Sequence, residues 1–291
     1  MVPKLVYLDT NLWNRLLDQG ADPTELLAEL KRRDATLVLS AQTVYELTRT
    51  FHSSPTRGME LFRYLMIYID VGVVGTYDNM DLLRNEVRAL YARADSVEAY
   101  FNTSEYGLLK SEVAKLAEGN LDDRVSTFIA GRTEFATTSR EQQKAHFEKR
   151  PDVKERLLAV PKSGLGPWLD EQVHSNVGAA MLTRHLIRIY ESTETDAAIS
   201  TALGLLQHPA SRIAKALVRA DLYSNWRCAH RGSNPRDLVD DMYHVLNASY
   251  ADVYATGEGG QKDYASLLLS QRTRPEFYDD CTNLAEWLVA I

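Results

Sequence analysis

The sequence predicts an α/β protein built on a parallel β-sheet. Two observations support this prediction: short apolar runs alternate with stretches of helical periodicity, and the runs are apolar throughout rather than at every second residue. The clearest run is Leu5-Val6-Tyr7-Leu8, and a second is Thr36-Leu37-Val38-Leu39. Strands that are buried on both faces of a parallel sheet have this composition.

The elements expected over residues 1–94 alternate between strands and helices. Strands are expected at residues 5–8, 36–39 and 69–74. Helices are expected at residues 12–17, 24–33, 41–51, 59–68 and 80–94. Asp22-Pro23 supplies a cap and a first-turn proline for the second helix, and Ser40 is suited to cap the third.

The middle of the chain has a different pattern. Between residues 95 and 232 clear strand runs are absent, and helical periodicity continues through segments broken by glycine and proline, which predicts an all-helical insertion. The α/β pattern then resumes at Asn234-Pro235 with a helix to about Tyr250, a strand at residues 253–255 and a terminal helix at 284–291. We therefore expect three segments: an α/β part at 1–94, the insertion at 95–232 and a closing α/β part at 233–291.

Composition indicates an ordinary globular protein in a reducing compartment. Hydrophobic residues make up 45% and charged residues 25% of the 291, and no apolar tract reaches the roughly 20 residues that cross a bilayer. No secretory signal pattern is present, so a cytoplasmic protein without a membrane partner is expected. Cys228 and Cys281 lie far apart without histidines at ligand spacing, which favours two reduced thiols over a disulfide or a zinc site.

Four acidic residues fall at strand ends or on flanking helices: Asp9, Glu46, Asp241 and Glu258. The carboxyl ends of parallel strands are where open α/β sheets bind ligands. Carboxylates gathered there could hold one or two hard divalent cations, which activate water and bind a scissile phosphate. Two of these acids also have a structural alternative, because Asp9 or Asn11 could cap the first helix and Glu46 could lie at a favourable helix start.

Four short motifs resemble the PIN domain family. They are Leu-Asp-Thr-Asn at residues 8–11, Ser-Ala-Gln-Thr-Val-Tyr-Glu-Leu at 40–47, Asp-Met-Tyr-His at 241–244, and Ala-Asp-Val-Tyr-Ala-Thr-Gly-Glu at 251–258. The resemblance covers about the first third and the last fifth of the chain. It implies a three-layer α/β/α fold and hydrolysis of RNA, less often of DNA, with Mg²⁺ or Mn²⁺. Many bacterial members are toxins of toxin–antitoxin pairs, although the long helical insertion departs from a compact toxin.

By this resemblance, Asp9, Glu46 and Asp241 are metal ligands and catalytic residues, and Glu258 completes the site. The family usually has an aspartate in the position of Glu258, so Asp263 is an alternative fourth ligand. Thr10, Asn11 and Thr256 are expected to support the ligands through hydrogen bonds. Asp240 is an alternative to Asp241, although the spacing to His244 favours Asp241. We expect His244 itself to be a satisfied interior residue.

Residues 211–236 are positively charged, in contrast to the net charge of −7. This stretch contains one acid, Asp221, and six basic residues that are candidate nucleic-acid contacts: Arg212, Lys215, Arg219, Arg227, Arg231 and Arg236. The first three share one helical face, and Tyr223 and Trp226 could stack on unpaired bases. The alternative is a solvated helix face with Trp226 in the core of the insertion.

Three functions are compatible with these residues. The leading one is a Mg²⁺- or Mn²⁺-dependent endoribonuclease, with RNA as substrate and with an antitoxin, a regulatory protein or a second copy of the chain as possible partners. The alternative is a catalytically inactive module of the same fold that binds nucleic acid or protein. A phosphatase with an aspartyl nucleophile at Asp9 ranks lower, because that chemistry usually requires a second acid at the position of Asn11.

Overall fold

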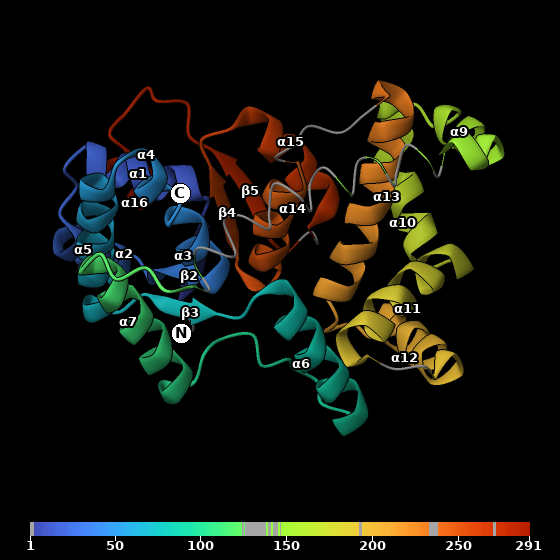
Figure 1. Ribbon diagram of the computed structural model, residues 1–291, viewed down its shortest axis with the longest axis horizontal. Helices are drawn as coiled ribbons and strands as arrows, with labels where there is room; N and C mark the ends of the chain where they lie inside the picture. The colour runs from blue at the N-terminus through green and yellow to red at the C-terminus, as the bar shows by residue number, and fades with distance from the viewer. Residues whose placement is uncertain are drawn as a thin grey trace.

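A five-stranded sheet forms the centre of the protein in the computed structural model, which describes residues 3–123, 125, 138, 141, 145, 147–191, 194–232, 238–269 and 272–291. Its strands are β1 (Lys4–Leu8), β2 (Ala35–Ser40), β3 (Val74–Thr76), β4 (Val253–Thr256) and β5 (Arg274–Phe277). Their order is β3-β2-β1-β4-β5 and every pairing is parallel, as the sequence predicted (Figure 1).

Side chains of alternate strand residues enter two different hydrophobic cores. In β1, Tyr7 belongs to one core, and Val6 and Leu8 belong to the other. The register continues this alternation across the sheet, because Tyr7 pairs with Val38 of β2 and with Tyr254 of β4, which share its core. Both faces of the sheet are therefore covered, which explains why the strand sequences are apolar throughout.

The face that receives Val6 and Leu8 is covered by helices from the first part of the chain and by the last helix. They are α1 (Thr10–Asp18), α2 (Pro23–Arg32), α3 (Ala41–Leu47), α4 (Thr50–Ser53), α5 (Pro55–Val71), α7 (Thr103–Ala117) and α16 (Leu284–Ala290). Trp13 of α1 meets Tyr68 of α5 edge to face, with ring centroids 5.2 Å apart. Helix α7 lies within the predicted insertion but packs on α5 (Figure 1).

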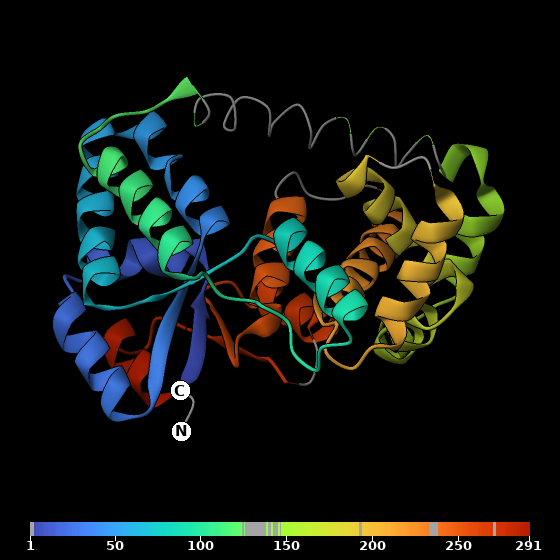
Figure 2. The same cartoon turned by 90° about the horizontal axis from the view of Figure 1, so that it is seen from below.

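The opposite face is covered by α6 (Asn79–Ala92), α14 (Leu238–Asn247) and α15 (Gly259–Leu268). Beyond them lies the helical segment, which contains α9 (Pro151–Leu158), α10 (Leu165–Val173), α11 (Asn176–Tyr190), α12 (Thr195–Gln207) and α13 (Ile213–Arg231) (Figure 2). Short 3-10 turns occupy Lys162–Gly164 and Ala248–Tyr250.

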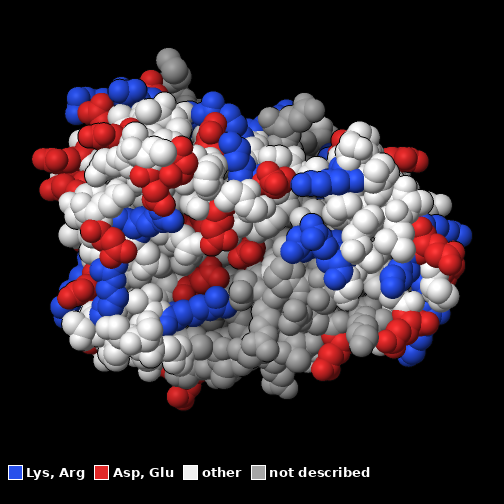
Figure 3. All heavy atoms as spheres, turned by 90° about the horizontal axis from the view of Figure 1, so that it is seen from above, with Lys and Arg blue, Asp and Glu red and all other residues white. Residues whose placement is uncertain are grey.

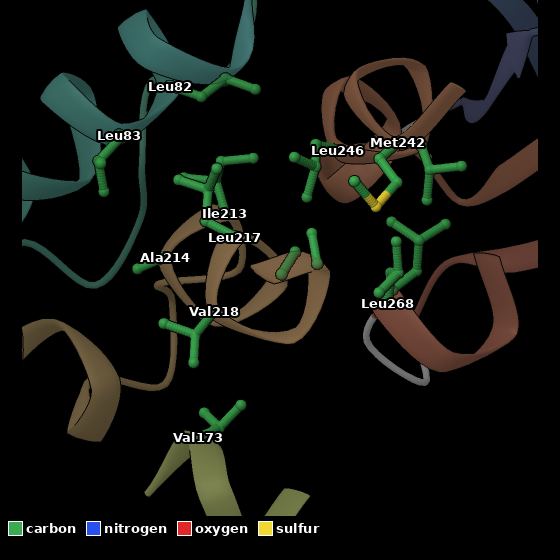
Figure 4. Close-up of a cluster of buried hydrophobic side chains, with 14 of the residues drawn as sticks. Leu82, Leu83, Val173, Ile213, Ala214, Leu217, Val218, Met242, Leu246 and Leu268 are labelled. Atoms are coloured by element: carbon green, nitrogen blue, oxygen red, sulfur yellow. The ribbon is translucent and has the colours of Figure 1, made fainter. Parts of the chain in front are cut away.

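The helical segment shares its core with the sheet. The close-up shows Leu217 of α13 among Leu83 of α6, Leu246 of α14 and Leu268 of α15 (Figure 4). Tyr7 of β1 belongs to the same cluster of buried side chains. Helix α13 is therefore one wall of the α/β core as well as the centre of the helical segment.

The third strand lies later than predicted. We expected a strand over residues 69–74, but α5 continues to Val71 and β3 begins at Val74, so that prediction was wrong. Gly72 ends the helix with φ of 129°, a conformation that glycine adopts without steric cost. The apolar residues before it belong to the buried side of a helix, and a short apolar run does not distinguish that arrangement from a buried strand.

Two other elements differ from the expectations. Strand β5 was not predicted, because its sequence Arg-Pro-Glu-Phe is polar and contains a proline, which an edge strand tolerates. The helix expected over residues 41–51 is divided near Thr48 into α3 and α4. Asn234, Pro235 and Arg236 lie outside the described residues. None of the described helices is long and apolar enough to cross a membrane.

Candidate functional site

Asp9 lies immediately after the last residue of β1. Its backbone N–H donates to the carbonyl oxygen of Ala255 at 2.9 Å, which extends the pairing of β1 with β4 by one residue. The carboxylate accepts a hydrogen bond from the Thr256 hydroxyl at 3.2 Å, and the residue is only 2% exposed. Asp9 occupies the N-cap position of α1, but its side chain accepts no hydrogen bond from that helix. The capping alternative is therefore not what holds this carboxylate in place.

Three further carboxylates lie close enough to Asp9 to influence its ionisation. Burial raises the pKa of Asp9 to about 8, with further contributions, in decreasing order, from the charges of Glu46, Glu258 and Asp241. These residues come from α3, the turn before α15, and α14 respectively. Three acids from segments that are distant along the chain thus lie within range of the charge on Asp9.

Glu46 is held by hydrogen bonds and ion pairs. The Thr10 hydroxyl donates to Glu46 Oε2 at 2.6 Å, as expected for a residue that supports the site. His244 Nε2 contacts the same carboxylate oxygen. Arg49, three residues later on the chain, approaches Glu46 Oε1 at 3.4 Å. The Glu46 carboxylate therefore has a defined orientation at the edge of the site.

His244 is an interior residue, as expected, and it also connects Glu46 to the sheet. It is 1% exposed, and its Nδ1 lies 3.3 Å from the Tyr7 hydroxyl. That hydroxyl also lies 2.8 Å from Ser40 Oγ and 3.0 Å from Thr43 Oγ1. Tyr7, Ser40 and Thr43 were not predicted as site residues from the sequence. A tyrosine inside a buried strand is the signal that could have indicated them, because a buried phenolic hydroxyl needs a partner.

Glu258 is exposed and contacts the side-chain amide of Asn11. The Thr256 hydroxyl accepts a hydrogen bond from the Glu258 backbone N–H at 3.0 Å, and its oxygen lies 3.1 Å from Gln261 Oε1. The alternative ligand Asp263 lies about one turn along α15 and is also exposed. The charges that contribute most to the raised pKa of Asp9 are those of Glu46, Glu258 and Asp241, and not that of Asp263. These placements favour Glu258. The alternative Asp240 has a side chain outside the described part of the structure.

A cavity of about 510 Å³ opens beside the acids and is lined by both charge types. The acids that line it are Asp241, Glu258 and Asp263, and the cations are Lys162, Arg227 and Arg231. Asp9 and Glu46 are not among its described lining residues. Figure 3 shows acidic side chains near the middle of this face of the molecule, in a hollow with basic side chains beside it. We call this cavity the acidic cleft.

The predicted basic stretch is divided between two cavities. Arg227 and Arg231 line the acidic cleft, whereas Arg212, Lys215 and Arg219 line a separate cavity at the other half of α13. The stretch is therefore not one continuous contact surface beside the acids.

The aromatic residues of the basic stretch are largely packed. Tyr223 is only 8% exposed, and the Trp226 indole N–H donates to the carbonyl oxygen of Val160 at 2.8 Å. Both residues line the acidic cleft, and Trp226 is partly buried against neighbouring core residues. Trp226 therefore packs in the helical segment, as one alternative expected, and also borders the cleft, where the other alternative placed a surface for stacking on bases.

The donor chemistry of the four acids fits a hard divalent cation. Carboxylate oxygens are the ligands that Mg²⁺ and Mn²⁺ prefer, and a cation beside Asp9 would favour its charged form. Among the described residues, no three His, Cys, Asp or Glu side chains are already arranged to hold one ion. Glu46 contacts His244, and Glu258 contacts Asn11. Asp9, Glu46, Asp241 and Glu258 are the residues that would hold an ion.

Comparisons with protein-family models, with curated proteins and with solved structures found no significant match to this chain.

Proposed function

We propose that this protein is a Mg²⁺- or Mn²⁺-dependent endoribonuclease with a PIN-like α/β domain. The observation that carries the proposal is the burial of Asp9 among three other carboxylates. A buried acid surrounded by like charges is costly to ionise, and such groups are concentrated at functional sites. The parallel sheet with helices on both faces agrees with the fold that the sequence motifs imply.

Four carboxylates would bind the metal: Asp9, Glu46, Asp241 and Glu258. A divalent ion bound there would supply an activated water and neutralise charge on the scissile phosphate. Thr10 and Thr256 orient Glu46 and Asp9, and Asn11 holds Glu258. Because these contacts come from rigid elements, the chain fixes the directions of its ligands.

Two arginines that line the acidic cleft would bind the RNA backbone. They are Arg227 and Arg231, and guanidinium groups are suited to phosphate oxygens. Trp226 borders the same space and could contact a base. Since water rather than the ribose hydroxyl is the attacking group, the products would carry a 5′-phosphate and a 3′-hydroxyl.

A second candidate is a catalytically inactive module that binds nucleic acid or protein. The observation that favours it is that the described carboxylates are not already gathered around one point. Under this alternative, Mg²⁺ would not stabilise the protein. Under the nuclease proposal it would, because a ligand that binds only the folded state adds about 2.7 kcal/mol at a hundred times its Kd.

The test combines labelled single-stranded RNA with the purified chain in Mg²⁺, in Mn²⁺ or in chelator. Asp9→Asn should lower cleavage at least about a hundredfold, because losing even an outer-sphere partner of a metal site costs about 10- to 100-fold. It should also abolish the rise of the melting temperature with Mg²⁺. Asp95→Asn, on an exposed loop residue, is the matched control and should behave like the unaltered protein.

Two results would reject the nuclease proposal. One is cleavage that persists in chelator and leaves a cyclic phosphate. The other is the absence of both Mg²⁺-dependent cleavage and Mg²⁺-dependent stabilisation, which would favour the inactive module.

A further inference from the structure

A second cavity, of about 640 Å³, lies between α10, the first half of α13 and the end of α15. We call it the basic cavity. Four cationic side chains line it: Arg212, Lys215, Arg219 and Arg272. Asp170 is the one carboxylate among the described lining residues. Four positive charges and one negative charge leave a formal charge of +3, in a protein whose net charge is −7.

Three of the cations are held in position by other groups. Arg219 Nη2 donates to Asp170 Oδ1 at 2.7 Å, and the Arg219 side chain is only 15% exposed. Lys215 Nζ donates to the carbonyl oxygen of His208 at 2.8 Å. The Arg212 guanidinium lies 5.2 Å from the centroid of the Tyr250 ring. Binding a ligand would therefore require little further ordering of these side chains, which favours affinity.

The buried carboxylate of Glu86 is engaged in hydrogen bonds at the start of α13. The carboxylate of Glu86 accepts hydrogen bonds from the backbone N–H groups of Ile213 at 2.6 Å and Ala214 at 3.0 Å. It also accepts one from the Tyr250 hydroxyl at 2.5 Å. Glu86 thus caps α13 and is not a lining residue of the basic cavity. Burial lowers the pKa of Lys215, and the charge of Glu86 opposes this effect.

Ser211 provides an independent observation. It lines the basic cavity, is 1% exposed, and its hydroxyl has no hydrogen-bond partner within the described structure. Buried polar groups are nearly always paired, so an unpaired hydroxyl beside four cations indicates a missing acceptor. The hydroxyl oxygen is closed to solvent, so an anion in the cavity would supply that acceptor once the Ser211 side chain turned toward it.

We propose that the basic cavity binds a small molecule that carries two or more phosphate groups. The charge of +3 exceeds what one phosphate neutralises, and guanidinium groups bind phosphate oxygens in a fixed geometry. The volume lies within the roughly 300–1,000 Å³ of small-molecule sites. Pro209, Leu267 and Leu269 add an apolar wall that could contact a flat organic group. A nucleoside polyphosphate has both features.

The ligand would lie next to the acidic cleft without entering it. Leu267 lines both cavities, and Arg219 and Tyr223, which line different cavities, are one helical turn apart on α13. The proposal does not require the nuclease activity, since none of the four carboxylates of the candidate metal site lines the basic cavity.

The test is calorimetric titration of the full chain with ATP, pyrophosphate and inorganic phosphate, in chelator and without RNA. ATP and pyrophosphate should bind, and phosphate should bind more weakly. Lys215→Gln combined with Arg272→Gln should weaken ATP binding about tenfold or more for each cation removed, as expected for lost charge-assisted contacts. Arg272→Gln alone, at an exposed position, provides a variant with little risk to folding.

Arg184→Gln combined with Arg188→Gln is the matched control, because it removes the same charge from exposed positions of α11. It should change the affinity less than about twofold, since distant exposed charges are screened. Equal losses in both double variants would overturn the proposal, as would the absence of ATP and pyrophosphate binding. Binding of single-stranded RNA alone would also overturn it and would assign the cavity to an RNA path. ATP binding should be unchanged in Asp9→Asn, which shows whether the basic cavity binds its ligand independently of the candidate metal site.

Discussion

Buried polar side chains at the candidate site form a connected set in which each member restrains the next. Tyr7, His244 and Glu46 come from β1, α14 and α3, and each contacts the next. In a low-dielectric interior such contacts are strong, and a group that loses its partner is destabilising. His244 is thus a positioning residue: it contacts the proposed ligand Glu46 rather than the substrate.

His244→Ala is expected to lower the free energy of unfolding by about 2–4 kcal/mol, because it leaves a cavity and removes partners of Tyr7 and Glu46. At a temperature where the variant is folded, the Mg²⁺ concentration for half-maximal cleavage should rise about 10- to 100-fold. The exposed His52→Ala should change stability by less than about 0.5 kcal/mol. An unchanged Mg²⁺ requirement in a folded His244→Ala protein would contradict the positioning role.

Among the elements, the end of α5 shows how one residue decides between helix and strand. Gly72→Ala should destabilise the protein by about 1 kcal/mol or more, because its φ of 129° is strained for alanine although no atom lies within 4 Å of the added Cβ. Gly107→Ala offers the matched control, since it has equal space but lies inside α7 with ordinary helical φ. It should stabilise by about 0.5–1 kcal/mol. Chemical denaturation measures both, and equal effects would contradict the strain.

Helix α13 begins at a buried carboxyl group, and this makes stability depend on pH. Burial raises the pKa of Glu86 from 4.5 to about 7, against the opposing effect of its hydrogen bonds. Between these values the folded state binds more protons than the unfolded state, so stability falls as pH rises from about 4.5 to about 7 and is constant above. The difference amounts to about 3 kcal/mol at most.

Glu86→Gln should remove this part of the pH dependence and should lower stability at low pH by about 1–3 kcal/mol, because one backbone N–H loses its acceptor. Denaturant unfolding at pH values from 4.5 to 8 provides the measurement. Glu171→Gln, at an exposed position of α10, should keep the slope of the unaltered protein. A Glu86→Gln protein with that same slope would show that another group is responsible.

On the scale of the whole molecule, a net charge of −7 coexists with two cavities that carry arginines. RNA bound in the acidic cleft should make contacts that weaken with salt. Arg227→Gln combined with Arg231→Gln should lower the slope of log K against log salt by about 1.4, at about 0.7 for each phosphate contact.

Fluorescence anisotropy with single-stranded RNA, on the Asp9→Asn background to prevent cleavage, measures this slope. The double variant Arg184→Gln and Arg188→Gln should leave it unchanged. Equal slopes in all three proteins would place the RNA elsewhere.

Local patterns in the sequence were sufficient for the parallel α/β class, for three of the five strands (β1, β2 and β4) and for the candidate acids. Runs such as Leu5-Val6-Tyr7-Leu8 indicate burial on both faces of the sheet, and an acid directly after such a run lies at the carboxyl end of the strand. Strand β5 was not predicted because this short edge strand has no apolar pattern.

Only the tertiary structure decided which side chains meet. His244 and Tyr7 are 237 residues apart, and no local spacing encodes their contact. The basic residues of α13 appear as one stretch in the sequence, yet α10 and α15 pack against the helix and divide them between two cavities. Backbone periodicity specifies a residue's face on its own element, whereas the neighbours of that face depend on how the whole chain packs.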